Sequence, residues 1–280
     1  MTFEHIITPE QLLANLEASN LIILDASIPP VGNTAVPSVR WPQQALPNAR
    51  RFDLEGDFSD QQSPLPHTMI SAEEFTRQAR KLGINRHSQV VVYDDLGIFS
   101  SARAWWMFRA MGFDKVAVLD GGLPLWRQKQ FPLAPAAGQE IAPGDFSASP
   151  RSGYFCDHLK VSQALADPHF SVMDARGAPR FYGKAPEPRA GVRSGHMPGA
   201  VNLPYTELLR EGCLKSKEVL RQKLQALATE HSSLVMTCGS GITACILALA
   251  ADYCGYPNIW VYDGSWSEWG QKLSLPVSCD

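Results

Sequence analysis

Short apolar runs alternate along the chain with longer stretches in which apolar positions recur every three or four residues. The apolar runs are rich in Val, Ile and Leu, as buried strands of parallel sheets are. The predicted strands are residues 21–25, 89–93, 116–119, 171–174, 234–237 and 259–262. The predicted helices are residues 8–20, 68–82, 102–111, a segment that ends before Asp167, residues 216–230 and a segment that follows Thr243. Strands that alternate with helices predict parallel βα units and therefore an α/β fold.

Several helix starts carry capping signals. Thr8 is placed to cap a helix that has Pro9 at its first position. Ser71 precedes Glu74 by three residues, which is nearly a capping box. Thr243 is an expected N-cap or first-turn residue, because good helix formers follow it.

The same order of elements occurs twice. An ungapped offset of 143 residues superposes Gly, Asp and Trp positions of the two halves. The pairs are Asp95 with Cys238, Gly112 with Gly255, Asp120 with Asp263, Gly121 with Gly264 and Trp126 with Trp269. The repeat predicts two tandem α/β domains, each a small, mostly parallel sheet flanked by helices. Only the second half has a cysteine after its central strand.

The stretch between the two halves is rich in proline, alanine and glycine and has few periodic apolar positions, as linkers do. We therefore expect a first domain at residues 1–130, a linker at 131–152 and a second domain at 153–280.

Composition narrows the class of protein. The chain has 280 residues, of which 45% are hydrophobic, and this length and composition suit two globular domains. Its net charge of −3 gives no sign of a basic surface that would bind nucleic acid or an anionic membrane. The apolar runs are too short to span a bilayer, and the N-terminus has no signal-peptide pattern. The six cysteines form no CxxC motif, so we expect reduced thiols and a cytoplasmic protein.

Cys238 stands where a predicted strand meets a glycine-containing loop and a helix. Gly239 and Gly241 permit a tight turn, whose backbone N–H groups, together with the helix dipole, can stabilise a thiolate. A cysteine in this position is often a core residue. The glycines on both sides of Ser240 favour a nucleophile instead, since a core cysteine does not need them.

Four segments together resemble the tandem-domain, rhodanese-type sulfurtransferases over nearly the whole chain. They are Asp174-Ala175-Arg176, the run from Arg193 to Asn202, the loop at Cys238, and the run from Tyr262 to Trp269. In that family the N-terminal domain is catalytically silent, which fits Asp95. The loop itself looks like the 3-mercaptopyruvate-using branch, because thiosulfate-using relatives carry basic residues directly after the cysteine. A neutral loop suits mercaptopyruvate, which carries one carboxylate away from its thiol, better than it suits dianionic thiosulfate.

The resemblance implies a role for each matching residue. Cys238 is the nucleophile that becomes a persulfide, and the loop Gly239, Ser240, Gly241, Ile242 and Thr243 surrounds it. Arg180, before an aromatic residue, and Arg189, after a Pro-Glu-Pro segment, match the substrate-binding arginines. Ser240, His67 and an acid match a polar trio. The acid is Glu55, with Asp53 also available.

The implied reaction transfers the sulfur of 3-mercaptopyruvate to cyanide, a small thiol or a thioredoxin-like dithiol protein, with release of pyruvate. It requires no metal and no organic cofactor. Two alternatives remain: a thiosulfate sulfurtransferase, and a non-catalytic module that relays a persulfide. A Cys-x5-Arg phosphatase is disfavoured because Ala244 stands where the phosphate-binding arginine is needed.

Overall fold

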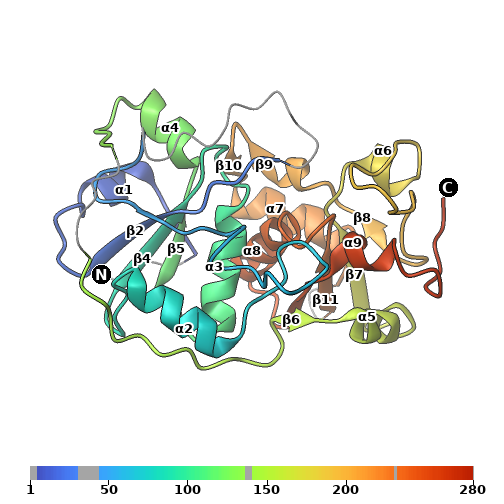
Figure 1. Ribbon diagram of the computed structural model, residues 1–280. Helices are drawn as coiled ribbons and strands as arrows, with labels where there is room; N and C mark the ends of the chain where they lie inside the picture. Colours follow the sequence, from blue (N-terminus) through green and yellow to red (C-terminus); the bar gives the residue numbers. More distant parts are fainter. Residues whose placement is uncertain (1–4, 31–43, 136–140, 230–231, 280) are drawn as a thin grey trace. The chain divides into compact units, whose positions relative to one another are not determined.

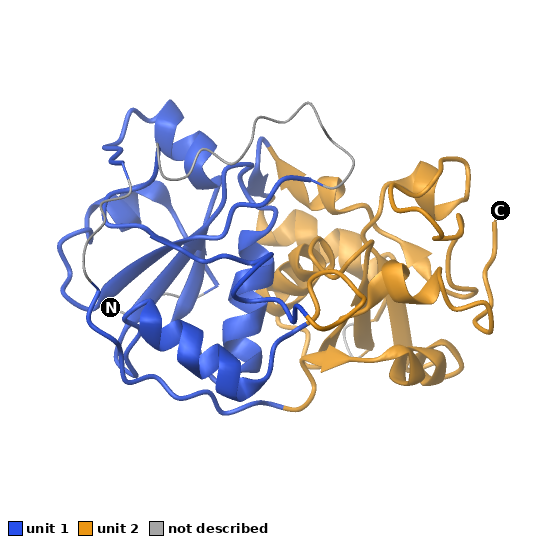
Figure 2. Ribbon diagram, viewed as in Figure 1, with its two compact units in different colours: residues 1–61, 69–151, 211–214 blue, residues 62–68, 152–210, 215–280 orange. Residues whose placement is uncertain are grey.

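The computed structural model describes residues 5–30, 44–135, 141–229 and 232–279. The chain forms two compact units (Figure 2). Unit 1 contains residues 1–61, 69–151 and 211–214, and unit 2 contains residues 62–68, 152–210 and 215–280. Two short segments are therefore grouped with the half of the chain to which they do not belong in sequence. The boundaries expected at residues 130 and 153 stay a prediction.

Unit 1 is built on a five-stranded parallel sheet with the strand order β1-β5-β4-β2-β3. Its strands are β1 (Ile6–Ile7), β2 (Leu21–Asp25), β3 (Arg50–Arg51), β4 (Gln89–Tyr93) and β5 (Val116–Leu119). Its helices are α1 (Pro9–Leu13), α2 (Ala72–Lys81), α3 (Ser101–Ala110) and α4 (Gly122–Gln128) (Figure 1). Consecutive side chains of β4 and β5 are buried, as expected for a parallel sheet that is covered on both faces.

Unit 2 repeats this plan with the strand order β6-β12-β11-β7-β8, again parallel. Its strands are β6 (Phe155–Cys156), β7 (Phe170–Asp174), β8 (Val201–Asn202), β11 (Ser233–Thr237) and β12 (Ile259–Tyr262). Its helices are α5 (His158–Leu165), α6 (Ala178–Phe181), α7 (Lys217–Gln225), α8 (Ala244–Cys254), α9 (Ser265–Trp269) and the 3-10 turn η1 (Tyr205–Leu208). A further two-stranded sheet, which belongs to neither five-stranded sheet, pairs β9 (Leu209–Arg210) with β10 (Cys213–Leu214).

The two sheets confirm the predicted fold class and the internal repeat. Their strand orders are equivalent, and the similarity extends to single hydrogen bonds. The Trp126 indole N–H donates to the Pro132 carbonyl (2.7 Å), and the Trp269 indole N–H donates to the Pro276 carbonyl (2.8 Å). Both indoles are buried in the core of their unit.

The strand register corrects one pairing of the repeat. Tyr93 is paired with Asp25 in the first sheet, and Thr237 is paired with Asp174 in the second. Tyr93 is therefore equivalent to Thr237, and the next residue, Asp94 rather than Asp95, occupies the position of Cys238. The ungapped offset missed this because the loop between β4 and α3 is one residue longer than the loop between β11 and α8.

Three helices are shorter than the sequence pattern predicts. Helix α1 ends at Leu13, because the Asn15 side chain donates to the Gln11 carbonyl (2.7 Å) and competes with the helical hydrogen bonds. Helix α2 begins at Ala72, where the Ser71 hydroxyl accepts the Glu74 N–H. Helix α7 ends at Gln225 rather than at residue 230, which lies outside the described residues.

The segment expected to be a linker binds closely to unit 1 over residues 141–151. The Phe146 side chain is buried against Phe75 and Phe113. Backbone hydrogen bonds join this segment to Ile84 and Met111. Residues 136–140 of the expected linker lie outside the described residues.

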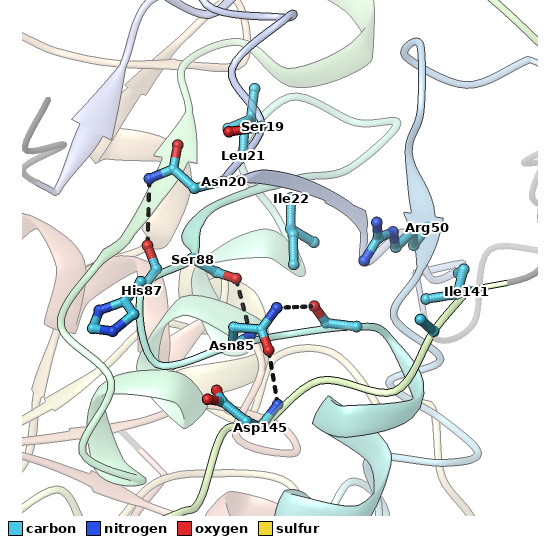
Figure 3. Close-up of a pocket in the computed structure, with 12 residues that line it drawn as sticks. Ser19, Asn20, Leu21, Ile22, Arg50, Asn85, His87, Ser88, Ile141 and Asp145 are labelled. Carbon is cyan, nitrogen blue, oxygen red and sulfur yellow. Dashed lines mark hydrogen bonds between the residues drawn. The ribbon is translucent and has the colours of Figure 1, made fainter.

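A cavity of about 510 Å³ opens in unit 1 at the amino ends of β2 and β4 (Figure 3). The Arg50 side chain lies against it and donates to the Leu82 carbonyl, and burial lowers the pKa of this guanidinium. Asp94 follows the carboxyl end of β4, so the cavity lies at the opposite edge of the sheet from Asp94.

Candidate active site

Cys238 follows the last residue of β11 and is 2% exposed. Its N–H donates to the Ser265 hydroxyl (3.2 Å), which in turn donates to the Tyr262 carbonyl (2.8 Å). Gly241 has a φ of +78°, a conformation that side chains resist, so a glycine is required for this turn. Thr243 is the N-cap residue of α8, as predicted, but its side chain makes no capping hydrogen bond.

The first turn of α9 fixes the start of the Cys238 loop. The Trp266 N–H donates to the Cys238 carbonyl (2.9 Å). Both the N–H (2.8 Å) and the hydroxyl (2.7 Å) of Ser267 donate to the Gly239 carbonyl. The sequence pattern assigned no role to Ser265 or Ser267. The signal that could have identified them is their position in the run from Tyr262 to Trp269, which resembles the family.

Arg180, on α6, lies beside the Cys238 loop. Its Nη2 is 3.1 Å from the point that a Cβ on Gly239 would occupy, so this glycine allows the guanidinium to approach the backbone closely. The Arg180 side chain is 30% exposed. Its Nε donates to Glu187 (3.1 Å), and its Nη2 also pairs with that carboxylate.

A buried ionic network lies behind Arg180. Arg176 pairs with Asp174 (2.7 Å) and with Glu187 (2.9 Å), and all three side chains are at most 4% exposed. The Arg176 guanidinium also lies over the Trp266 ring, 4.2 Å from its centroid. Burial opposes the charge of Arg176, but the two carboxylates outweigh it and raise the pKa of the guanidinium.

Arg189 approaches the same loop from another direction. Its Nη1 donates to the Ser267 hydroxyl at 3.5 Å, and that hydroxyl contacts the Gly239 carbonyl. Arg180 therefore lies against Gly239, the residue after Cys238, and Arg189 reaches the same residue through the Ser267 hydroxyl.

The structure brings His67 to Ser240. The His67 Nδ1 and the Ser240 hydroxyl are 3.1 Å apart, and both residues are buried. His67 has a φ of +59°, which is unusual for a residue with a side chain. The turn that contains His67 is held by its own hydrogen bonds, including one between the Ser63 and Thr68 hydroxyls (2.7 Å). These bonds present the imidazole to Ser240, although 173 residues separate the two in sequence.

The predicted acid of the trio lies in unit 1, whereas His67 and Ser240 lie in unit 2. Glu55 is exposed. The alternative, Asp53, accepts the Gly56 N–H (3.1 Å) in its own turn. The participation of either residue in the trio stays a prediction.

The loop between β4 and α3 in the first half, which is equivalent to the Cys238 loop, surrounds a buried carboxylate. The Asp94 carboxylate is fully buried and accepts the N–H groups of Leu96 (3.0 Å), Phe99 (2.8 Å) and Ser101 (2.9 Å), and the Ser101 hydroxyl (2.6 Å). Burial raises the pKa of Asp94, while these hydrogen bonds act in the opposite direction. The loop after β4 thus surrounds a carboxylate with donors, at the position where Cys238 stands in the second half.

Ile242 and two residues outside the predicted loop support the site by packing. Ile242 is 4% exposed, and Cys245 is fully buried. The His196 Nδ1 lies 3.0 Å from the Phe181 carbonyl, and its ring stacks on Phe181 next to Arg180, so His196 supports this region structurally.

Within the described part of the chain, no three His, Cys, Asp or Glu side chains are grouped as metal ligands. In the same residues, no helix has the length and apolar character needed to cross a membrane.

Comparison with known proteins gives consistent matches. The model of the rhodanese-like domain matches residues 8–129 and 158–272. Human 3-mercaptopyruvate sulfurtransferase is 41% identical over 93% of this chain and 88% of its own length. Rat thiosulfate sulfurtransferase is 37% identical over 94% of this chain and 89% of its own length.

A solved structure agrees with this assignment. SseA from Escherichia coli, described as a 3-mercaptopyruvate sulfotransferase, superposes with a TM-score of 0.84 and 32% identity, over 94% of this chain and 99% of its own. The family expected from the Cys238 loop and its partner segments is confirmed. The chain belongs to the rhodanese family and contains two copies of its domain.

Proposed function

We propose that this protein is a sulfurtransferase that takes sulfur from 3-mercaptopyruvate onto Cys238. The observation that carries the proposal is the convergence of two arginines and a serine–histidine pair on a cysteine loop with no charged side chain. Arg180 lies against Gly239, Arg189 contacts Ser267, and His67 contacts Ser240. Such a site offers cations at its rim for a carboxylate and neutral donors next to the reacting sulfur.

In the first step the Cys238 thiolate attacks the thiol sulfur of 3-mercaptopyruvate. A sulfur–sulfur bond forms, the carbon–sulfur bond breaks, and its electron pair passes to the enolate of pyruvate. Arg180 and Arg189 hold the carboxylate and keto oxygen of the donor and stabilise the negative charge of the enolate. The backbone N–H groups of residues 239–243 stabilise the thiolate and then the persulfide.

Ser240 and His67 carry a proton in the same step. The donor thiol loses one proton, and the enolate carbon gains one, so a single relay serves both ends of the reaction. With Nδ1 3.1 Å from the serine oxygen, His67 can accept a proton from Ser240 or return it. Glu55, or Asp53, would orient the imidazole.

In the second step an acceptor attacks the outer sulfur of the persulfide and regenerates the Cys238 thiolate. Cyanide, a small thiol and the dithiol of a thioredoxin-like protein are chemically competent acceptors, and we place the protein in the cytoplasm, where such thiols are abundant. No metal or organic cofactor enters either step.

The second candidate is thiosulfate as the donor. The similarity to rat thiosulfate sulfurtransferase favours it. Opposing it is the loop Gly239 to Thr243, which contains no lysine or arginine to neutralise a dianion next to the sulfur.

The test compares initial rates with 3-mercaptopyruvate and with thiosulfate, using cyanide as the acceptor, for the wild type and Cys238→Ser. We expect a kcat/KM at least tenfold higher for 3-mercaptopyruvate, and no turnover of either donor by the variant. A preference for thiosulfate would reject the donor assignment. Turnover by Cys238→Ser would reject the nucleophile. A wild type that turns over neither donor, and whose Cys238 gains its outer sulfur only from another persulfide, would identify a relay module.

A further inference from the structure

The Glu187 carboxylate bridges two arginines of the catalytic unit. One oxygen accepts from Arg176 Nη1 (2.9 Å) and from Arg180 Nε (3.1 Å), while the other accepts from Arg180 Nη2. The Glu187 side chain is only 4% exposed, whereas the Arg180 side chain is 30% exposed. A buried acid therefore holds one edge of a guanidinium whose remainder faces solvent and the Cys238 loop.

This contact fixes the plane of the Arg180 guanidinium. A guanidinium that is bound through both Nε and Nη2 to one carboxylate cannot rotate about its last side-chain bonds without losing two charge-assisted hydrogen bonds. Nη1 makes no hydrogen bond to a described residue and is left for another acceptor. Arg180 thus presents a fixed donor edge next to Gly239.

Glu187 is itself held rigidly. Arg176 binds Asp174 through Nε and Nη2 and donates to the Gly195 carbonyl (2.8 Å). Asp174 is the last residue of β7 and is paired in the sheet with Thr237, which directly precedes Cys238. An ionic chain therefore links β7, which is paired with the strand preceding Cys238, to the Arg180 guanidinium.

The stability of the network alone does not require Glu187 to bind Arg180. Asp174 already pairs with Arg176 through two of its nitrogens, and Arg180 is exposed enough to be solvated by water. Glu187 therefore orients Arg180, and this orientation requires the burial of a second carboxylate beside that of Asp174.

We propose that Glu187 is a positioning residue, which holds Arg180 in the orientation that binds the carboxylate of the sulfur donor. The inference rests on the proposed function, because it assumes that Arg180 binds the donor. Loss of the Glu187 charge frees the guanidinium, so donor binding weakens more than the chemical step. Glu187 touches neither the donor nor the reacting sulfur.

The test is a double-mutant cycle of Glu187→Gln and Arg180→Gln with 3-mercaptopyruvate as the donor. We expect Glu187→Gln alone to raise KM about tenfold, the loss of roughly one charge-assisted hydrogen bond, with kcat changed less than threefold. In the Arg180→Gln background, the same change should alter KM less than twofold. An equal effect in both backgrounds, or an unchanged KM in the single variant, would overturn the inference.

Two controls separate this test from folding and from the proposed function. Glu207→Gln removes another ion-paired carboxylate of unit 2, bonded to Lys223 (2.8 Å), and should leave KM unchanged. Pyruvate affinity, measured by calorimetry without turnover, should fall in parallel with the rise in KM.

If the wild type does not turn over 3-mercaptopyruvate, the proposed function fails. If it does and KM is insensitive to Glu187, only the positioning role fails. Glu187→Asp, whose shorter side chain cannot reach both arginines, repeats the test should Glu187→Gln not fold.

Discussion

At the scale of single residues, the six cysteines differ in their surroundings. Burial and the neighbouring Asp157 raise the pKa of Cys156 to about 12. Burial and the nearby Asp120 raise the pKa of Cys213 to about 11. Both thiols remain protonated at neutral pH, and only the thiolate reacts with electrophiles. Cys238 instead faces a loop that we expect to stabilise negative charge.

We expect iodoacetamide at pH 8 to modify Cys238 at least 100-fold faster than Cys156 or Cys213. A thiol whose pKa lies three units above the working pH has about 0.1% thiolate, and raising the pH towards 11 should accelerate modification of Cys213 before that of Cys156. Peptide mapping by mass spectrometry after short exposures gives the rates. Equal labelling of Cys156 and Cys238 at pH 8 would contradict the assignment.

His67→Ala should lower kcat for 3-mercaptopyruvate by about 100-fold, because the proton relay through Ser240 loses its base. The alkylation rate of Cys238 should change much less, since the loop amides remain. His169→Ala, which removes an exposed imidazole of the same unit, is the matched control. Unchanged turnover in His67→Ala would remove the serine–histidine pair from the mechanism.

Sequence patterns predicted the candidate residues of the Cys238 loop, and the resemblance to the family supplied Arg180 and Arg189. They could not reveal Glu187 as a partner of Arg180, because an acid in a proline-rich loop is most often solvated. They also could not establish the contact between His67 and Ser240, which depends on a turn that folds against a distant loop. The resemblance alone suggested that pair.

At the scale of elements, strands were predicted more closely than helices. β4, β5 and β12 begin and end at the predicted residues, because a buried parallel strand is a continuous apolar run bounded by polar residues. Helix ends depend on local competition by side chains, such as that of Asn15, which hydrophobic periodicity does not report.

The loop between β4 and α3 gives a prediction at this scale. Asp94→Asn keeps one acceptor oxygen but turns an amide NH2 towards backbone N–H groups in a fully buried site. We expect the free energy of unfolding to fall by about 1–3 kcal/mol, the cost of unsatisfied buried donors. Urea unfolding measures the change, with the exposed Asp57→Asn as the control. Turnover by the folded protein should remain within twofold of wild type, and a large loss would contradict the silent role of the first copy.

At the scale of the whole molecule, the repeat explains why the fold could be predicted from one sequence. Two copies of one strand order provide two independent sets of Gly, Asp and Trp positions, and the buried Trp126 and Trp269 reproduce the same hydrogen bond. The single-residue difference between the loops at Asp94 and Cys238 escaped an ungapped comparison, because most of the helix and the strand that follow keep the offset.

The Asp94 carboxyl group in the loop after β4 suggests how the equivalent loop after β11, which contains Cys238, responds to a negative charge. Asp94 supplies a carboxyl group to its loop in every state of the molecule, whereas the loop after β11 receives an anion only when the sulfur of Cys238 is ionised. A persulfide is a stronger acid than a thiol, so sulfur-loaded molecules should hold this anion over a wider pH range and resist heat better.

We expect treatment with 3-mercaptopyruvate, followed by removal of small molecules, to raise the melting temperature by about 2–4 °C, which corresponds to about 1 kcal/mol for a protein of this size. Addition of cyanide should reverse the shift, and Cys238→Ser should show none. A shift in that variant, or no shift in the wild type, would contradict the expectation. Calorimetry could then measure the fraction of molecules that carry a persulfide on Cys238 without a chemical assay for sulfur, because these molecules would unfold at a higher temperature.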